Sequence, residues 1–259
     1  MVRTMRLTVL GCSGSVGGPG AACSGYLIEV PGEQPVLMDC GPGVFGELQR
    51  YVDPTEVAVV LSHLHADHCM DLPAMLVWRR YAPKPATGRV PLYGPTGTAW
   101  RIGAGSSEYS GKIDDISDTF DVHEWDGSEI LLCGLRIQPM EVDHLPETWG
   151  LRITGPQGQV IAYSGDTAMC DGVVDVAADA DLFLCEASWT HAPADRPPHL
   201  HLSGVEAGQI ATKANVKALA VTHVAPWSDK PAILDEAREH FAGPVDMVRQ
   251  GQVIELSGD

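Results

Sequence analysis

The segment 61–71 holds the residues best suited to chemistry. Within it, three histidines and a carboxylate fall in six consecutive positions, in the pattern His63-x-His65-x-Asp67-His68. Neutral imidazole is the commonest metal ligand in proteins, whereas imidazoles clustered without a metal would have poorly matched donors and acceptors. A single loop histidine would carry little information, but this spacing predicts that four metal ligands converge from one loop.

The elements around this segment explain how its side chains could meet. The apolar run 57–61 predicts a buried strand directly before the cluster. Side chains alternate along extended backbone, so His63 and His65 project to the same side, and a turn can bring Asp67 and His68 round to face them. Three further candidates stand where other predicted strands end, namely His144, Asp166 and His223. This shared placement indicates one common site.

Short apolar segments alternate with helical segments along the whole chain. We expect strands at 6–10, 26–30, 35–39, 57–61, 90–93, within 131–142, and at 151–153, 159–163, 181–185, 217–221 and 253–256. Helices are expected at 44–50, 72–81, 204–214 and 230–241, and Ser203 with Glu206 predicts a capping box for the third of them. A helix and a mobile loop are expected within 95–118, and a proline-rich connector at 193–198. The mixture predicts an α/β fold, in which one domain over residues 1–259 contains two sheets with helices on their outer faces.

Composition narrows the class of protein and of partner. The 259 residues are 44% hydrophobic and 20% charged, as in ordinary globular proteins. A net charge of −17 disfavours nucleic acid, which is bound largely through Lys and Arg. The seven cysteines form no C-x-x-C pair, which suits thiols that stay reduced. Residues 1–7 contain no apolar stretch long enough for a signal peptide or membrane helix. We therefore expect a cytoplasmic protein without a nucleic-acid or membrane partner.

Several residues outside the cluster have alternative interpretations. The glycine-rich loop 11–20 could bind a phosphate through Ser13 or Gly14, although such a loop is more often only a turn. Trp149 and Trp227 could line a base pocket or pack in the core. Asp39, at a strand end, is expected to orient its neighbours by hydrogen bonds. Ordinary structural roles are expected for His123, His191, His199 and His240.

The full ordered set of histidines and aspartates resembles the metallo-β-lactamase superfamily, and the resemblance covers essentially the whole chain. It implies a four-layer αββα sandwich with a dinuclear metal centre at one edge. One ion would be bound by His63, His65 and His144, the other by Asp67, His68 and His223, and both would be bridged by Asp166. Zinc is the ion expected first, with manganese or iron as alternatives.

Four further segments resemble ribonuclease Z and the related bacterial cyclic-nucleotide phosphodiesterases. They are Ser164-Gly165-Asp166-Thr167, Glu186-Ala187-Ser188, His201-Leu202-Ser203 and Thr222-His223. The resemblance implies that His201 protonates the leaving oxygen and contacts the substrate, and that Glu186 positions His201. It also implies that Asp67 is catalytic as well as a metal ligand. Ribonuclease Z has a long arm that grips transfer RNA, typically between the segments matching His144 and Asp166, and here only residues 145–165 lie there.

The expected function is therefore that of a dinuclear metal-dependent hydrolase acting on a small phosphodiester. The chain looks most like the actinobacterial class that converts 3′,5′-cyclic AMP to AMP. Two divalent ions would lower the pKa of a water molecule toward ~7 and neutralise phosphoryl charge. Two alternatives remain, a transfer-RNA 3′ endonuclease and a non-catalytic module that binds metal or nucleotide. A homodimer is expected because relatives often pair.

Overall fold

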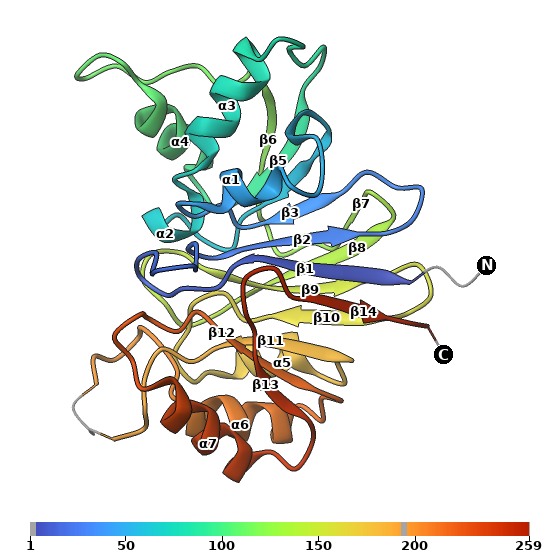
Figure 1. The fold of residues 1–259 in the computed structure, drawn as a ribbon, viewed down its shortest axis with the longest axis vertical. Coiled ribbons are helices and arrows are strands. Elements are labelled where there is room, and N and C mark those ends of the chain that lie inside the picture. The colour runs from blue at the N-terminus through green and yellow to red at the C-terminus, as the bar shows by residue number, and fades with distance from the viewer. Residues whose placement is uncertain (1–3, 193–195, 259) are drawn as a thin grey trace.

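A computed structural model describes residues 4–192 and 196–258 of the chain. Two sheets of seven strands each lie face to face, with helices on their outer sides (Figure 1). Residues 1–3 and positions 193–195 of the predicted proline-rich connector lie outside the described residues. The predicted α/β sandwich is confirmed.

The first sheet has the strand order β14-β1-β2-β3-β4-β5-β6. Strands β14 to β3 pair antiparallel, and β3 to β6 pair parallel. The bounds are Met5–Gly11 for β1, Gly25–Glu29 for β2, Val36–Met38 for β3, Ala58–Val60 for β4, Val90–Gly94 for β5, Phe120–Glu124 for β6 and Val253–Leu256 for β14.

The second sheet has the strand order β13-β12-β11-β10-β9-β8-β7. Strands β7 to β10 pair antiparallel, and β10 to β13 pair parallel. The bounds are Ile130–Leu132 for β7, Leu135–Glu141 for β8, Trp149–Thr154 for β9, Val160–Tyr163 for β10, Leu182–Glu186 for β11, Leu219–Thr222 for β12 and Val245–Met247 for β13.

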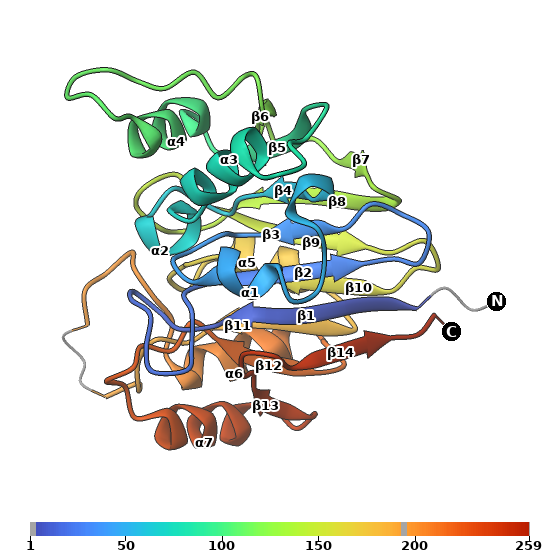
Figure 2. The ribbon, with the colours of Figure 1, turned by 45° about the horizontal axis from the view of Figure 1, so that its top comes forward.

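The helices connect the strands of each sheet and cover its outer face (Figure 2). The helices on the first sheet are α1 (Val44–Leu48), the 3-10 turn η1 (Pro54–Glu56), α2 (Ala66–Cys69), α3 (Leu72–Tyr81) and α4 (Thr98–Ser106). The helices on the second sheet are α5 (Asp171–Ala177), α6 (Gly204–Lys213) and α7 (Lys230–His240). The longest, α7, has 11 residues. Among the described residues, none of the helices has the length and apolar character needed to cross a bilayer.

The main core fills the space between the two sheets. The inward side chains of β1 and β2 pack there against those of β9 and β10. At its centre the rings of Tyr26 and Tyr163 lie 5.3 Å apart, and the Tyr26 hydroxyl is 2.6 Å from the hydroxyl of Thr222. Burial of this apolar surface is the main force that holds the two sheets together.

Most of the predicted elements are present. The helix over 72–81, the hairpin of β9 and β10 and the capping box of Ser203 with Glu206 are confirmed. Strands β6 and β13 and helix α5 were not expected from the sequence. The first two are short edge strands with polar residues, and α5 contains the β-branched run Val173-Val174, which does not favour helix.

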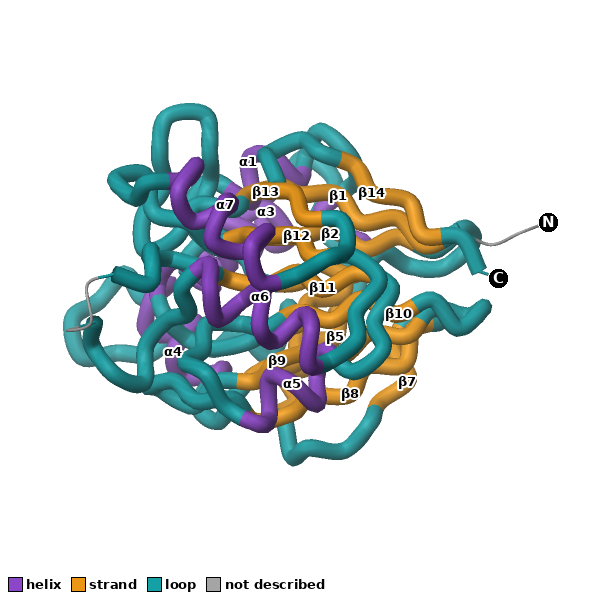
Figure 3. Tube along the Cα trace, turned by 90° about the horizontal axis from the view of Figure 1, so that it is seen from below, coloured by secondary structure: helices purple, strands orange, loops and turns teal. Residues whose placement is uncertain are grey.

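One end of the sandwich gathers the loops that matter for function. Strands β10, β11 and β12 are parallel, so they end at the same edge of the second sheet. Strand β8 runs in the same direction as β10, because both are antiparallel to β9, and it ends at this edge too. The loops after β4, β8, β10, β11 and β12 consequently lie at the end of the molecule opposite the two termini (Figures 1 and 3).

Candidate metal centre

All seven predicted ligands lie in loops or turns at this one end of the sandwich. His63 and His65 follow β4, and Asp67 and His68 lie in the single turn of α2. On the second sheet, one ligand follows each of three strands, namely His144 after β8, Asp166 after β10 and His223 after β12.

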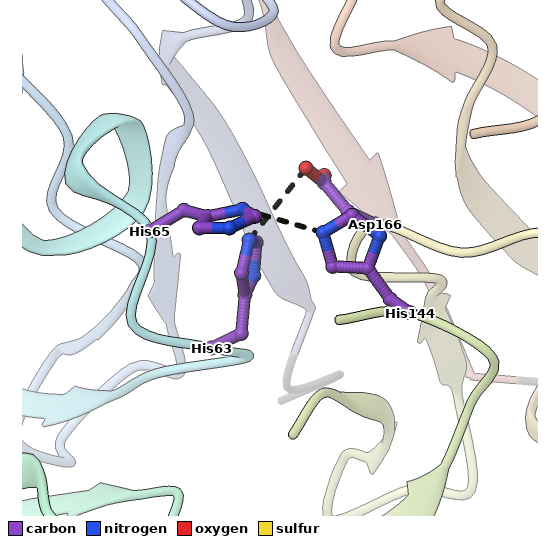
Figure 4. Close-up of side chains that lie close together, drawn as sticks. All are labelled: His63, His65, His144 and Asp166. Carbon is purple, nitrogen blue, oxygen red and sulfur yellow. Dashed lines mark hydrogen bonds and ion pairs between the residues drawn. The ribbon is translucent and has the colours of Figure 1, made fainter. Parts of the chain in front are cut away.

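The side chains form two groups that share one carboxylate. In each group the potential ligand atoms all lie within 4.8 Å of one another. The first group contains His63, His65, His144 and Asp166 (Figure 4), and the second contains Asp67, His68, Asp166 and His223. These are the two sets that the sequence analysis assigned to two ions. The structure therefore brings the residues together, and their role as ligands stays a prediction.

The polar atoms that face this space fit metal ions. Among the described residues, the buried Nε2 atoms of His63, His68 and His223 and Oδ1 of Asp166 have no hydrogen-bond partner. A buried polar atom without a partner costs free energy, which a bound cation would offset. Imidazole nitrogens with carboxylate oxygens are ligands that suit zinc. The cluster is therefore able to bind metal ions.

Asp166 lies at the middle of the cluster. Its carboxylate oxygens are 3.2 Å from His223 Nε2, 3.3 Å from His68 Nε2 and 3.6 Å from His63 Nε2. Burial by itself would raise the pKa of Asp166, but the surrounding imidazoles of His223, His68 and His63, among which His68 is the one held protonated, keep it well below its usual range. The residue is thus a permanent anion between the two groups of imidazoles.

Hydrogen bonds from behind the cluster fix the imidazole rings. Nδ1 of His144 donates to the carbonyl of Leu200 at 2.8 Å, so in a neutral ring Nε2, which lies 3.3 Å from His65 Nδ1, carries the lone pair. A hydrogen bond of 2.9 Å joins His223 Nδ1 to the Ser24 hydroxyl, across from the first sheet. Such partners set the tautomer and ring orientation of histidine ligands.

Asp39 is the centre of the hydrogen bonds on the first sheet. Its carboxylate accepts from the backbone and the hydroxyl of Ser62, from His68 Nδ1 and from the Tyr163 hydroxyl, each at 2.8 Å. As predicted, it orients its neighbours. Asp39 and His223 both adopt left-handed backbone conformations, with φ of 58° and 54°. Such conformations cost free energy in residues other than glycine, and they cluster at functional sites.

His201 and Glu186 form a pair beside Asp166. His201 Nδ1 donates to the Glu186 carboxylate at 2.9 Å and lies 3.9 Å from Asp166. Glu186 also accepts from the backbone N–H of Thr167 and is fully buried. Burial by itself would lower the pKa of His201, but the charge and hydrogen bond of Glu186 outweigh it and raise the pKa to about 9.

The pKa is lowered in four of the five histidines among the predicted ligands, namely His63, His65, His144 and His223. Burial lowers the pKa of His63 well below its usual value and that of His223 to about 4. Burial would likewise lower the pKa of His68, but Asp166 and Asp39 raise it well above the usual value. A metal ion at His68 would therefore displace a proton.

The glycine-rich loop lies against His223. A Cβ placed on Gly14 would come 2.4 Å from the carbonyl oxygen of His223, so only glycine allows this approach. Ser13 is buried, and its hydroxyl donates to the carbonyl of Val16. Gly14 thus packs against His223, and the contact of Ser13 or Gly14 with a substrate stays a prediction.

The two tryptophans with alternative interpretations differ in the structure. Trp149 is 6% exposed and its Nε1 donates to Glu147, so it belongs to the core. Trp227 is 70% exposed. The histidines expected to be structural make ordinary contacts with Asp121 (His123), Ser203 (His191), Asp143 (His199) and the Glu236 carbonyl (His240).

Sequence reasoning missed several positioning residues. The Ser24 hydroxyl, the Tyr163 hydroxyl and the Leu200 carbonyl each hold a group of the cluster. Ser24 and Tyr163 lie in or beside apolar strand segments, and a backbone carbonyl has no sequence signal. Only Ser62, inside the motif, could have been found, and it lies 3.1 Å from His63 Nδ1.

Comparisons with known proteins agree with this geometry. A family model described as "Beta-lactamase superfamily domain" matches residues 34–224. The protein Rv1339 of Mycobacterium tuberculosis is 53% identical over 98% of this chain and 93% of its own length. The probable metallo-hydrolase YhfI of Bacillus subtilis is 28% identical over 97% of this chain and 100% of its own length. The crystal structure of YhfI superposes with a TM-score of 0.85, 25% identity and coverage of 98% and 100%.

A ribonuclease Z of Haloferax volcanii is more distant. It is 24% identical over 98% of this chain and 95% of its own length. The aligned region spans 305 positions, more than the 259 residues of this chain, so the relative contains segments that are absent here.

Proposed function

This chain belongs to the metallo-β-lactamase superfamily and is a metallo-hydrolase, and on that premise we propose that its substrate is a small phosphodiester. The reaction we favour is hydrolysis of 3′,5′-cyclic AMP to AMP. One observation carries the proposal, namely that the His201–Glu186 pair lies beside Asp166, the carboxylate shared by the two ligand groups. This arrangement supports a role for His201 as a proton donor next to two potential cation sites, as hydrolysis of a diester requires.

The two groups of side chains would hold two divalent ions, with zinc proposed first and manganese or iron as alternatives. His63, His65 and His144 would hold one ion, Asp67, His68 and His223 the other, with Asp166 between them. Two bound ions would lower the pKa of a water molecule and neutralise charge on the phosphoryl oxygens.

The chain's own residues supply the proton and the positioning. His201, with a pKa of about 9, carries a proton at neutral pH and donates it to the leaving oxygen of the ester. Glu186 keeps the imidazole charged and fixes its orientation. Asp67, with a side chain 13% exposed, is open enough to accept a hydrogen bond from water in the site.

Activity on transfer RNA is the second candidate, because a ribonuclease Z is among the relatives. Two features favour a small substrate instead. Between His144 and Asp166 the chain forms only the hairpin of β9 and β10, and its net charge is −17. Nucleic-acid binding weakens steeply with salt, whereas salt screens the repulsion between this acidic protein and a small anion. Turnover that rises with ionic strength would favour the small substrate.

The test is incubation of metal-loaded protein with cyclic AMP and chromatographic detection of AMP. We expect turnover in the wild type and loss of at least about a hundredfold in Asp166→Asn, because the variant lacks the central anion. No AMP with zinc, manganese or iron would reject the proposal, as would full activity in Asp166→Asn. Ligand binding without turnover would instead support a non-catalytic module, and light scattering would test the predicted homodimer.

A further inference from the structure

Two tryptophans lie on loops that a hydrogen bond joins, and one of them, Trp189, contacts His201. Trp189 follows β11, and its ring meets that of His201 edge to face, with centroids 5.2 Å apart. Trp227 follows His223 by four positions. The neighbour of Trp227, Ser228, donates its hydroxyl to the carbonyl of Ser188, the neighbour of Trp189, at 2.9 Å. The loop of Trp227 is thus tied to the loop of Trp189, whose ring contacts His201.

Trp227 is exposed although its loop is well held. The Ser188 hydroxyl donates to the carbonyl of His223, and a Cβ placed on Gly18 would lie 3.0 Å from the ring of Pro226. The indole of Trp227 is nevertheless 70% exposed, whereas Trp125 and Trp149 are each 6% exposed. An indole on a fixed loop loses little conformational entropy when it binds a ligand, so its exposure suits recognition.

We propose that Trp227, on the loop joined to that of Trp189, binds the aromatic base of a nucleotide substrate by stacking. The inference rests on the proposed phosphodiesterase function and assigns the residue that recognises the base of its nucleotide substrate. Stacking requires no positive charge, which suits a protein with 34 acidic and 17 basic residues. The phosphodiester would lie at the cluster beside His201, and the base would lie outside it, over the exposed indole.

The decisive experiment compares two substrates in matched variants. One substrate is 3′,5′-cyclic AMP, and the other is the same cyclic phosphate of methyl riboside, in which a methoxy group replaces the base. We expect the wild type to prefer cyclic AMP by about tenfold or more in kcat/KM, mostly through KM, as one stacked base would give. Trp227→Ala should lose this preference, and Trp227→Phe should keep most of it.

Trp100→Ala is the matched control, because Trp100 is 62% exposed but lies on α4. It should keep the wild-type preference. Calorimetric titration with AMP gives a second readout, in which Trp227→Ala should bind about tenfold more weakly. Equal losses on both substrates in Trp227→Ala, or an unchanged preference, would overturn the inference while the phosphodiesterase function stands. Failure of the wild type to hydrolyse either substrate would refute the proposed function itself.

Discussion

Each buried carboxylate of the cluster lies next to an imidazole that can balance its charge. Asp166 and Asp39 are both buried, and each faces His68, from opposite sides of its ring. A buried carboxylate is tolerated only with such partners, because desolvation of an unpaired charge costs several kcal/mol. The two carboxylates therefore fix the position and the proton of His68 together.

Asp39→Asn should weaken metal binding without removing any ligand. The neutral amide cannot support His68 as the carboxylate does, so we expect the affinity for zinc to fall about 10- to 100-fold. Competition with a chromophoric chelator measures this. Asp71→Asn is the control, because among the described residues the Asp71 side chain accepts hydrogen bonds only from the backbone of Gly43 and Phe45, away from His68. Equal affinities in wild type and Asp39→Asn would contradict the role given to Asp39.

His201→Gln should show an effect that depends on the leaving group. With an alkoxide leaving group, kcat should fall about 10²- to 10⁴-fold, since the proton donor is lost. With p-nitrophenolate, which leaves without protonation, the loss should be much smaller. Metal content, measured by atomic absorption, should remain that of the wild type. Equal losses with both leaving groups would show that His201 is not the acid.

Glu186→Gln should move the alkaline limb of the pH–kcat profile to lower pH. A general acid works only while protonated, so activity falls as the pH rises through the pKa of His201, which is about 9 in the wild type. Without the carboxylate of Glu186, that pKa should fall. An alkaline limb at the same pH in both proteins would argue against the pair.

At the scale of elements, α6 and the loop before it carry the proton donor. The loop holds both His201 and the Leu200 carbonyl that orients His144. Helix α6 is fixed on α7 by close contact, since a Cβ on Gly204 would lie 2.1 Å from the carbonyl oxygen of Ile233. The capping box and the Arg196–Glu206 ion pair then join loop and helix.

Glu206→Gln should destabilise the fold by about 1 kcal/mol near pH 7, as loss of a capping interaction does. Burial would raise the pKa of Glu206, but Arg196 and Ser203 lower it to about 2. A lowered pKa contributes stability above the unfolded-state value near 4.5, and that contribution is lost as the pH falls toward 2. Urea unfolding at several pH values tests this, and a difference that persists at low pH would contradict it.

At the scale of the whole molecule, the cluster joins the two halves of the sandwich. His63, His65, Asp67 and His68 come from the first sheet, and His144, Asp166 and His223 come from the second. Without cations, several of their buried polar atoms have no hydrogen bond among the described residues. A bound ion would therefore act on folding stability as well as on chemistry.

Removal of divalent ions should lower the thermal stability. At ion concentrations about 100 times Kd, binding adds about 2.7 kcal/mol to the free energy of unfolding. For a chain of this size that corresponds to a difference in Tm of about 5–10 °C, which calorimetry with and without chelator measures. Asp166→Ala serves as the control and should show a smaller difference. An equal Tm with and without chelator would argue against ions that join the two sheets.

The sequence alone predicts the parts of this protein that depend on local patterns. The spacing of His63, His65, Asp67 and His68 after an apolar strand placed four candidates in one turn, and the capping box marked the start of α6. The alternation of apolar and helical segments predicted the α/β class. These features follow from the periodicity of side chains and from hydrogen bonds between residues a few positions apart. Both are visible in the sequence itself.

Only the tertiary structure decides the contacts made across the sandwich. Ser24 meets His223 over a separation of 199 residues, and Tyr163 meets Asp39 over 124. The same packing buries Trp149 and leaves Trp227 exposed, although both follow a candidate ligand closely. Such outcomes depend on how the two sheets face each other, because the burial of a side chain and the partner it finds are set by distant segments rather than by its neighbours in sequence.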